Sequence, residues 1–312
     1  MREGRSVHRA EWRRRLLSLT GLFGLLGTGP PATAAVACSF DAATATVTAS
    51  VSGFTPERSL RNTMSVEGGA ILFEGDRCGE ATTTNADTIV VTGSVKDDVF
   101  VVDTRSGPFA PGATPDAAGS SEIEFHVDLG GGPDLLRIVA TGGPDRIVVG
   151  SSGVDLDDDA AANITMTRMA ALVFGLGGDD VLSGRGGADT GGAYELFLGL
   201  FGGGDKDRLI GGSRSDTLVG GGGVDRLIGR GGGDILVGRS GRDTLKGGGG
   251  GDLLIGGRGR DRITGGPGHD QLRGMTGSDL LRAGPGQDEM NGGAGVDRCR
   301  GGQWDTKVSC ER

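Results

Sequence analysis

Aromatic residues are scarce in this chain, at 4% of 312 residues. A conventional core built on large aromatic side chains is therefore not expected, because those residues normally supply much of the buried apolar area. Histidine occurs three times, and His126 in "EFHVD" is predicted to point outward from a strand rather than to act as a base. No G-x-S-x-G or H-E-x-x-H motif occurs. We therefore expect a protein that is not an enzyme and has no catalytic residues.

Positive charge is also in deficit. Asp and Glu outnumber Lys and Arg by 41 to 32, and the formal net charge is −9. Nucleic acid is not an expected partner, because its binding requires a basic face, whereas cations are candidate ligands. The apolar run at 16–26 is too short and too interrupted by glycine to span a bilayer. No membrane span is expected.

The first 34 residues have the composition of a secretory signal peptide. Three arginines at 13–15 precede the apolar run, and small residues after it offer cleavage following Ala34 or Ala37. The arginines also resemble a twin-arginine signal, so the general and twin-arginine routes both remain open. Either route predicts a secreted, extracellular protein.

Only four cysteines are present, and no two have the C-x-x-C spacing that structural zinc sites prefer. Outside the cytoplasm they should oxidise. The sequence alone does not fix how four cysteines pair. We favour one disulfide near each end of the chain, Cys38–Cys78 and Cys299–Cys310, over a zinc site.

The region at 35–128 is expected to be β-rich and irregular. Segments rich in Val, Ile and Thr at 87–94, 97–103 and 121–130 predict short strands, because they are bounded by Gly, Asp and Pro. No helical periodicity follows the signal peptide. Between 129 and 174, Gly-Gly-x-Asp turns lead into apolar strands without a fixed period, which predicts degenerate solenoid repeats.

Glycine, by contrast, is abundant, with 65 residues. It is not spaced every third residue with abundant proline, which excludes a collagen helix. From residue 175 the chain repeats G-G-x-G-x-D-x-U-x every nine residues, where U is a large apolar residue. The aspartates on this period are Asp180, Asp189, Asp207, Asp216, Asp225, Asp234, Asp243, Asp252, Asp261, Asp270, Asp279, Asp288 and Asp297. Every interval is nine residues except the one from Asp189 to Asp207, which is eighteen.

The apolar residue of each repeat predicts how the repeats pack. Alternate side chains of a strand face opposite sides, so this residue can point inward. Its occupants are Leu182, Leu209, Leu218, Leu227, Leu236, Leu245, Leu254, Ile263, Leu272, Leu281 and Met290, with Gly191 and Cys299 as exceptions. One inward residue cannot form a core, but coils of two nonapeptides can stack these side chains on one another.

The aspartates and glycines together predict a cation site. Calcium prefers about six to eight oxygen ligands. One turn offers a single carboxylate and a few carbonyls, so we expect two stacked turns to share each calcium ion. Glycine allows the positive φ that aims carbonyls at an ion. Because carboxylates in neighbouring coils would stand about 4.8 Å apart and repel, binding of several calcium ions should be coupled to folding.

Some turns match the pattern more closely than others. Five turns fit G-G-x-G-x-D fully, and their first glycines are further candidate calcium-binding residues: Gly220, Gly247, Gly256, Gly265 and Gly292. In three other turns Arg230, Arg239 and Met275 replace the second glycine, which makes those sites weaker candidates.

Residues 175–299 resemble the haemolysin-type calcium-binding repeats of bacterial RTX proteins. The resemblance implies an all-β fold in which a right-handed parallel β-roll holds calcium between adjacent turns. It also implies that any catalytic or toxic activity lies in another domain. Many members of that family lack an N-terminal signal peptide, so the segment at 1–34 departs from their usual export route.

The irregular interval at 190–207 and the C-terminal segment carry separate expectations. With alternate nonapeptides on the same side, one ladder should contain Asp180, Leu198, Asp216 and every eighteenth residue after it, and the other Asp189, Asp207 and their successors. A site that needs a carboxylate at 198 should be weak or empty. The apolar cluster at 194–201 should pack on a neighbouring loop rather than form a docking patch. At 300–312 we expect a cap in which Trp304 covers the open end.

These features favour a secreted calcium-binding protein that serves as a structural or interaction module. A second hypothesis is an adhesin or surface-associated protein that binds a protein or surface partner through 35–128. An enzyme with an unrecognised site is the least favoured hypothesis.

Overall fold

The computed structural model describes residues 38–51, 62–94, 97–106, 109, 123–131, 133–156, 164–166, 169–186 and 192–311. The predicted signal peptide and Asp189 lie outside these residues. The described residues are all β, with strands arranged in two sheets. They include no helix with the length and apolar character that crossing a membrane would need.

Sheet A has fourteen strands and sheet B thirteen. In spatial order, sheet A contains β1 (Cys38–Asp41), β2 (Thr46–Ser50), β6 (Thr88–Ser94), β8 (Glu124–Gly130), β12 (Ile164–Met166), β11 (Gly153–Asp155), β10 (Arg146–Val149), β14 (Val181–Ser183), β16 (Arg208–Ile210), β18 (Arg226–Gly231), β20 (Thr244–Gly249), β22 (Arg262–Thr264), β24 (Leu280–Arg282) and β26 (Arg298–Arg300). Sheet B contains β5 (Asp76–Thr82), β4 (Ala70–Phe73), β3 (Thr63–Glu67), β7 (Val99–Asp103), β9 (Leu135–Val139), β13 (Ala170–Leu176), β15 (Leu198–Gly203), β17 (Thr217–Gly223), β19 (Ile235–Gly241), β21 (Leu253–Gly259), β23 (Gln271–Thr276), β25 (Glu289–Ala294) and β27 (Thr306–Val308).

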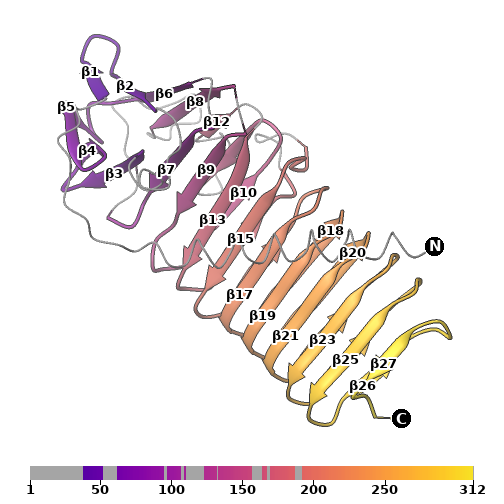
Figure 1. The fold of residues 1–312 in the computed structure, drawn as a ribbon. Helices are drawn as coiled ribbons and strands as arrows, with labels where there is room; N and C mark the ends of the chain where they lie inside the picture. The colour runs from indigo at the N-terminus through magenta and orange to yellow at the C-terminus, as the bar shows by residue number, and fades with distance from the viewer. Residues whose placement is uncertain are drawn as a thin grey trace. The chain divides into compact units, whose positions relative to one another are not determined.

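Successive strands of the repeats alternate between the two sheets and pair in parallel with the strand one coil away. From β15 to β26, residues eighteen apart are neighbours, as in the pairs Leu218–Leu236 and Leu227–Leu245. Figure 1 shows the strands of sheet B from β13 to β25 side by side along this stack. This arrangement is a parallel β-roll, as the sequence predicted.

The core of the roll consists of two columns of aliphatic side chains. The sheet A column contains Leu182, Leu209, Leu227, Leu245, Ile263 and Leu281, and the sheet B column Val173, Leu200, Leu218, Leu236, Leu254, Leu272 and Met290; every one is 0% exposed. Each strand of the repeats contributes one such residue, so burial depends on the coil above and below. The predicted inward position is confirmed.

The N-terminal strands join the same two sheets. β8 pairs with β6 and β12, and β9 pairs with β7 and β13, all in parallel. These coils are filled by larger residues, including Phe73, Phe100 and Phe125. His126 is exposed on β8, in an alternating pattern of burial, as predicted. The predicted strands at 87–94, 97–103 and 121–130 correspond to β6, β7 and β8.

The prediction of which aspartates stack at the start of the repeats is wrong. β14 pairs directly with β16, which aligns Val181 with Arg208, twenty-seven residues later. Asp180 therefore precedes Asp207 in sheet A and does not share a side with Leu198. The nonapeptide between β14 and β15 forms no strand of its own among the described residues. It lengthens one connection, whereas Leu200 remains in register with Leu218.

Part of the apolar segment at 194–201 fills this longer connection. Tyr194 is 2% exposed and its hydroxyl donates to the Met169 carbonyl, while Leu198 is 0% and Phe201 6% exposed. The segment packs locally, as expected.

The C-terminal segment folds back over the last coil, but Trp304 does not cover it. Both predicted disulfides are present, Cys38–Cys78 and Cys299–Cys310, and β27 pairs with β25. Trp304 nevertheless is 72% exposed. The next residue, Asp305, turns its carboxylate toward the backbone N–H groups of Asp288 and Gly302, so the preceding side chain faces solvent, like Val224 and Val296 before their aspartates.

Candidate metal sites

The repeat aspartates form two ladders, one along the line where the strands of each sheet begin. In each ladder the backbone N–H of one aspartate donates to Oδ1 of the aspartate in the next coil, mostly at 2.8–3.0 Å. The sheet A ladder is Asp145, Asp180, Asp207, Asp225, Asp243, Asp261, Asp279 and Asp297; the sheet B ladder is Asp216, Asp234, Asp252, Asp270, Asp288 and Asp305.

The nine-residue period did not identify two aspartates at the ends of the ladders, Asp145 and Asp305. Asp145 follows "TGGP", and Asp305 follows "GGQW". Both therefore come after a Gly-Gly pair, which is a signal, but their spacing from the next repeat aspartate is not nine residues. The structure, by contrast, brings together every described aspartate that the period identified.

The second carboxylate oxygen of most ladder aspartates is buried without a hydrogen-bond partner. This holds for Oδ2 of Asp180, Asp207, Asp225, Asp243, Asp252, Asp261, Asp270, Asp279, Asp288 and Asp297. The residues are only 1–2% exposed or fully buried. Since a buried polar atom without a partner is costly, a regular row of such oxygens indicates that a ligand satisfies them.

Most of these oxygens lie against a glycine five residues earlier in the same turn; before Asp288 that position is Ala283. A Cβ atom on Gly265 would overlap Asp270 Oδ2 and would lie 2.7 Å from the Ala283 carbonyl oxygen. The first glycines of the other full matches, Gly220, Gly247, Gly256 and Gly292, face the Oδ2 atoms of Asp225, Asp252, Asp261 and Asp297 in the same way. Glycine at this position therefore leaves a space lined by oxygen atoms.

At the second glycine position of the turn, positive φ does not depend on glycine being present. Gly257 and Gly266 have φ of 118° and 134°, and the replacements Arg239 and Met275 have φ of 77° and 81°. Arg230 adopts 84°. The three replacements therefore preserve the left-handed turn, so the departures from the sequence pattern leave the backbone path intact.

Burial makes the ladder carboxylates reluctant to ionise. Loss of hydration raises the pKa of Asp180, Asp207 and Asp270 to about 7, and neighbouring carboxylates contribute a smaller increase. The pKa values of Asp225, Asp243, Asp252, Asp261 and Asp279 rise to about 6, mainly for the same reason. A positive charge close to Oδ2 would offset this cost.

These donors fit a hard divalent cation such as calcium. No three His, Cys, Asp or Glu side chains converge on one point in the described ranges, so the side chains alone cannot enclose an ion. Carboxylate oxygens and the carbonyls of glycine-rich turns are nevertheless the ligands that calcium prefers. The imidazoles and thiolates that favour zinc are not part of the ladders.

The first aspartate of the sheet B ladder, like Asp305 at its other end, differs from the aspartates between them. In the coil before Asp216, its place is taken by Leu198, whose N–H donates to Asp216 Oδ1 at 3.2 Å. The other oxygen, Oδ2, accepts the N–H of Gly212 at 2.7 Å. Both oxygens of Asp216 are thus already bonded to the backbone.

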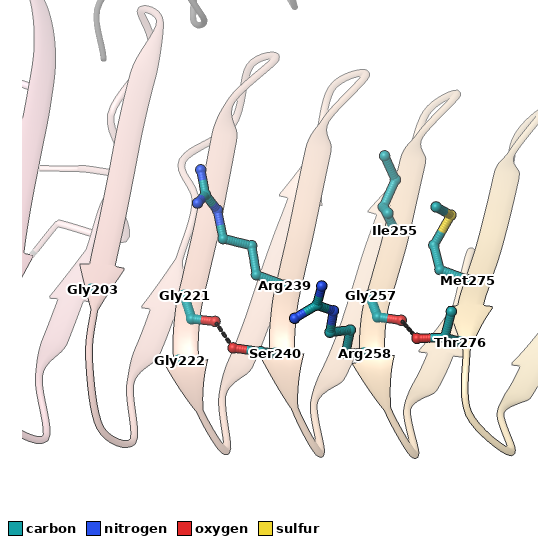
Figure 2. Close-up of a pocket in the computed structure, with 10 residues that line it drawn as sticks. All are labelled: Gly203, Gly221, Gly222, Arg239, Ser240, Ile255, Gly257, Arg258, Met275 and Thr276. Atoms are coloured by element: carbon teal, nitrogen blue, oxygen red, sulfur yellow. Dashed lines mark hydrogen bonds between the residues drawn. The ribbon is translucent and has the colours of Figure 1, made fainter. Parts of the chain in front are cut away.

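The outer face of sheet B carries a shallow groove that is separate from the ladders. Figure 2 shows its lining, which includes Arg239, Arg258 and Ile255. The hydroxyls of Ser240 and Thr276 donate to the Gly221 and Gly257 carbonyls at 3.2 and 3.3 Å. Those hydrogen bonds brace neighbouring coils.

Comparison with protein families identifies the repeats. The family model of the RTX calcium-binding nonapeptide repeat matches residues 172–190, 201–236, 228–263, 237–272 and 264–299. Residues 191–200, in the lengthened connection, are not matched. Comparison with curated proteins gave no significant match. RTX nonapeptide repeats bind calcium ions, and several copies are present; over residues 172–299 the chain is an RTX-type repeat protein.

Proposed function

We propose that the protein is a secreted, non-catalytic calcium-binding module whose roll folds when calcium occupies the aspartate ladders. The observation that carries this proposal is the row of buried Oδ2 atoms without partners. Oδ2 atoms and turn carbonyls would hold the ions, which supply the positive charge that the buried carboxylates need. The two disulfides and the RTX repeats support an extracellular location.

The ladder residues have distinct roles in this proposal. Oδ1 of each aspartate orients the next coil by accepting a backbone N–H, while Oδ2 remains available to a cation. Glycines leave the space beside Oδ2 open. The stacked leucines exclude water from the other side. None of these groups is arranged to transfer a proton or attack a substrate, which supports a structural role.

Calcium removal tests the coupling of binding to folding. We expect the chelated protein to lose most of its β-sheet circular dichroism and to regain it at millimolar calcium, because like-charged buried carboxylates then repel. An unchanged spectrum and melting temperature after chelation would refute the coupling.

A single substitution tests the sites themselves. Asp252→Asn keeps an Oδ1 acceptor for the Asp234 N–H but replaces the anionic oxygen. We expect it to raise the calcium midpoint of folding by about tenfold, which corresponds to about 1.4 kcal/mol. Glu289→Gln changes an exposed acid outside the ladders to the residue at the paired position, Gln271, and serves as the matched control. Equal effects of the two variants would contradict the assignment.

A further inference from the structure

The outer face of sheet A in the roll is basic. Its exposed side chains come from positions that flank the inward residue in β16 to β26. They include Arg208, Arg226, Lys246, Arg262, Arg282, Arg298 and Arg300, which we call the basic face. The strand pairing places them in two rows across the strands: Arg208, Arg226, Arg262 and Arg298 in one, Lys246, Arg282 and Arg300 in the other.

No acidic residue interrupts these rows. The remaining positions between β16 and β26 are Ile210, Ile228, Thr244, Thr264 and Leu280. None of the seven basic residues forms a salt bridge within the described part of the chain. Sheet B differs: over the same coils the equivalent two rows, from β17 to β25, hold a single basic residue, Arg273, and include aliphatic residues such as Val219 and Ile255.

The acidic residues of the roll are mostly internal. The ladder carboxylates are buried, and among the described residues of 170–300 the exposed acids are Asp179, Glu195, Asp205 and Glu289. Once a divalent cation neutralises the ladders, the arginines and lysines dominate the surface. The net charge of −9 for the whole chain therefore conceals a roll that is cationic outside.

The shape of the face narrows the choice of partner. Neighbouring basic positions in a row lie about 4.8 Å or a multiple of it apart, along the axis on which the coils stack. An anionic bilayer would extend beyond the roll and would also meet the outer face of β8 in the same sheet. Glu124 and Asp128 are exposed on that face, and the bilayer would repel them. A linear polymer can lie along the rows alone.

We propose that the basic face binds a linear polyanion, an acidic polysaccharide in chemical class, along the stacking axis of the calcium-loaded roll. The proposal rests on the proposed function to the extent that the face exists only when the roll is folded. Attraction between the rows and the polymer comes mainly from Coulomb energy and from release of the polymer's counterions, so it should fall steeply with salt.

Dextran sulfate is a suitable probe, with neutral dextran as the control polymer. The test variant combines Arg208→Thr, Arg226→Thr and Arg262→Thr, each matching Thr244 in the same row. The control variant removes three charges elsewhere by Arg258→Ser, Arg260→Gln and Arg273→Asn, copying Ser240, Gln287 and Asn291 at equivalent places. Circular dichroism at one fixed calcium concentration verifies folding in every sample.

We expect the native protein to bind dextran sulfate and not dextran, more weakly as NaCl rises from about 50 to about 200 mM. The test variant should lose about tenfold or more in affinity, and the control variant much less. Equal losses in the two variants, or no binding by folded protein, would overturn the proposal. So would tighter binding to phosphatidylglycerol vesicles or duplex DNA than to dextran sulfate. Failure to fold with calcium would instead refute the proposed function, and this inference with it.

Discussion

A ladder aspartate uses its two carboxylate oxygens differently. Oδ1 of Asp261 accepts the N–H of Asp243 at 2.8 Å, whereas its Oδ2 is buried without a hydrogen-bond partner. The first oxygen sets the stacking of the coils and the second faces the proposed ion. Asparagine could replace the first role but not the second, which explains why the repeat requires a carboxylate rather than any hydrogen-bond acceptor.

Two glycines of one turn should differ in their tolerance of substitution. Gly259 has φ of 129°, and a Cβ there would overlap the Gly241 carbonyl. We expect Gly259→Ala to destabilise the calcium-bound roll by about 1–3 kcal/mol. A Cβ on Gly257 would also approach a carbonyl, that of Arg239. Gly257→Met should nevertheless cost less, because its neighbour in the next coil, Met275, already combines a side chain with a positive φ.

Calcium-bound melting temperatures of the two variants measure this difference. A Glu289→Gln variant controls for a change at an exposed position elsewhere in the repeats. A larger loss for Gly257→Met than for Gly259→Ala would show that the carbonyl contact does not limit the turn.

At the scale of the strand and turn, the nonapeptide that lengthens the connection between β14 and β15 shifts which sheet the following repeats join. The repeat positions nevertheless remain multiples of nine residues apart. Leu182 and Leu200 are both inward, yet eighteen residues rather than nine separate them. Asp180 consequently stacks on Asp207 in sheet A. The sheet B ladder then begins at Asp216, because Leu198 occupies the preceding coil.

The start of this ladder leads to a test of stoichiometry. Since both oxygens of Asp216 accept backbone N–H groups, we expect Asp216→Asn to leave the number of bound calcium ions unchanged while lowering stability. Asp252→Asn, in the middle of the same ladder, should reduce that number. Calorimetric titration of the full chain measures both. A loss of bound calcium in Asp216→Asn equal to that in Asp252→Asn would contradict this view of the ladder's first residue.

For the molecule as a whole, local periodicity was enough to predict the roll but not its ends. The inward leucines and the described aspartates follow from spacing, since each depends on contacts that recur every coil. Asp145, Asp305 and the exposed Trp304 depend on where the repeat stops, which a period does not encode. Which aspartate stacks on Asp180 depends on whether the following nonapeptide forms a strand or lengthens a connection. Both arrangements have the same nine-residue spacing in the sequence, so the spacing cannot distinguish them.

The same internal carboxylates predict an unusual pH dependence for the calcium-free protein. Burial raises the pKa of Asp180, Asp207 and Asp270 to about 7, above the ordinary value of 3.8 for an unfolded chain. The charges of Asp145, Asp179 and Asp205 raise the pKa of Asp180 further, and those of Asp252 and Asp288 raise that of Asp270. Backbone hydrogen bonds from Asp145 and Asp252, and the charge of His269 near Asp270, act in the opposite direction.

When the pKa of a group is higher in the folded than in the unfolded state, the folded state binds more protons at pH values between the two pKa values. The stabilising effect of such a group is complete at low pH and is lost as pH rises through the folded pKa. In metal-free buffer we therefore expect more β-sheet circular dichroism at about pH 5 than at about pH 7.5. Saturating calcium should remove or reverse this difference, because cation binding requires the ionised carboxylate. Circular dichroism at both pH values, with and without calcium, measures the effect; a metal-free β-sheet signal that rises with pH would show that ladder ionisation does not oppose folding.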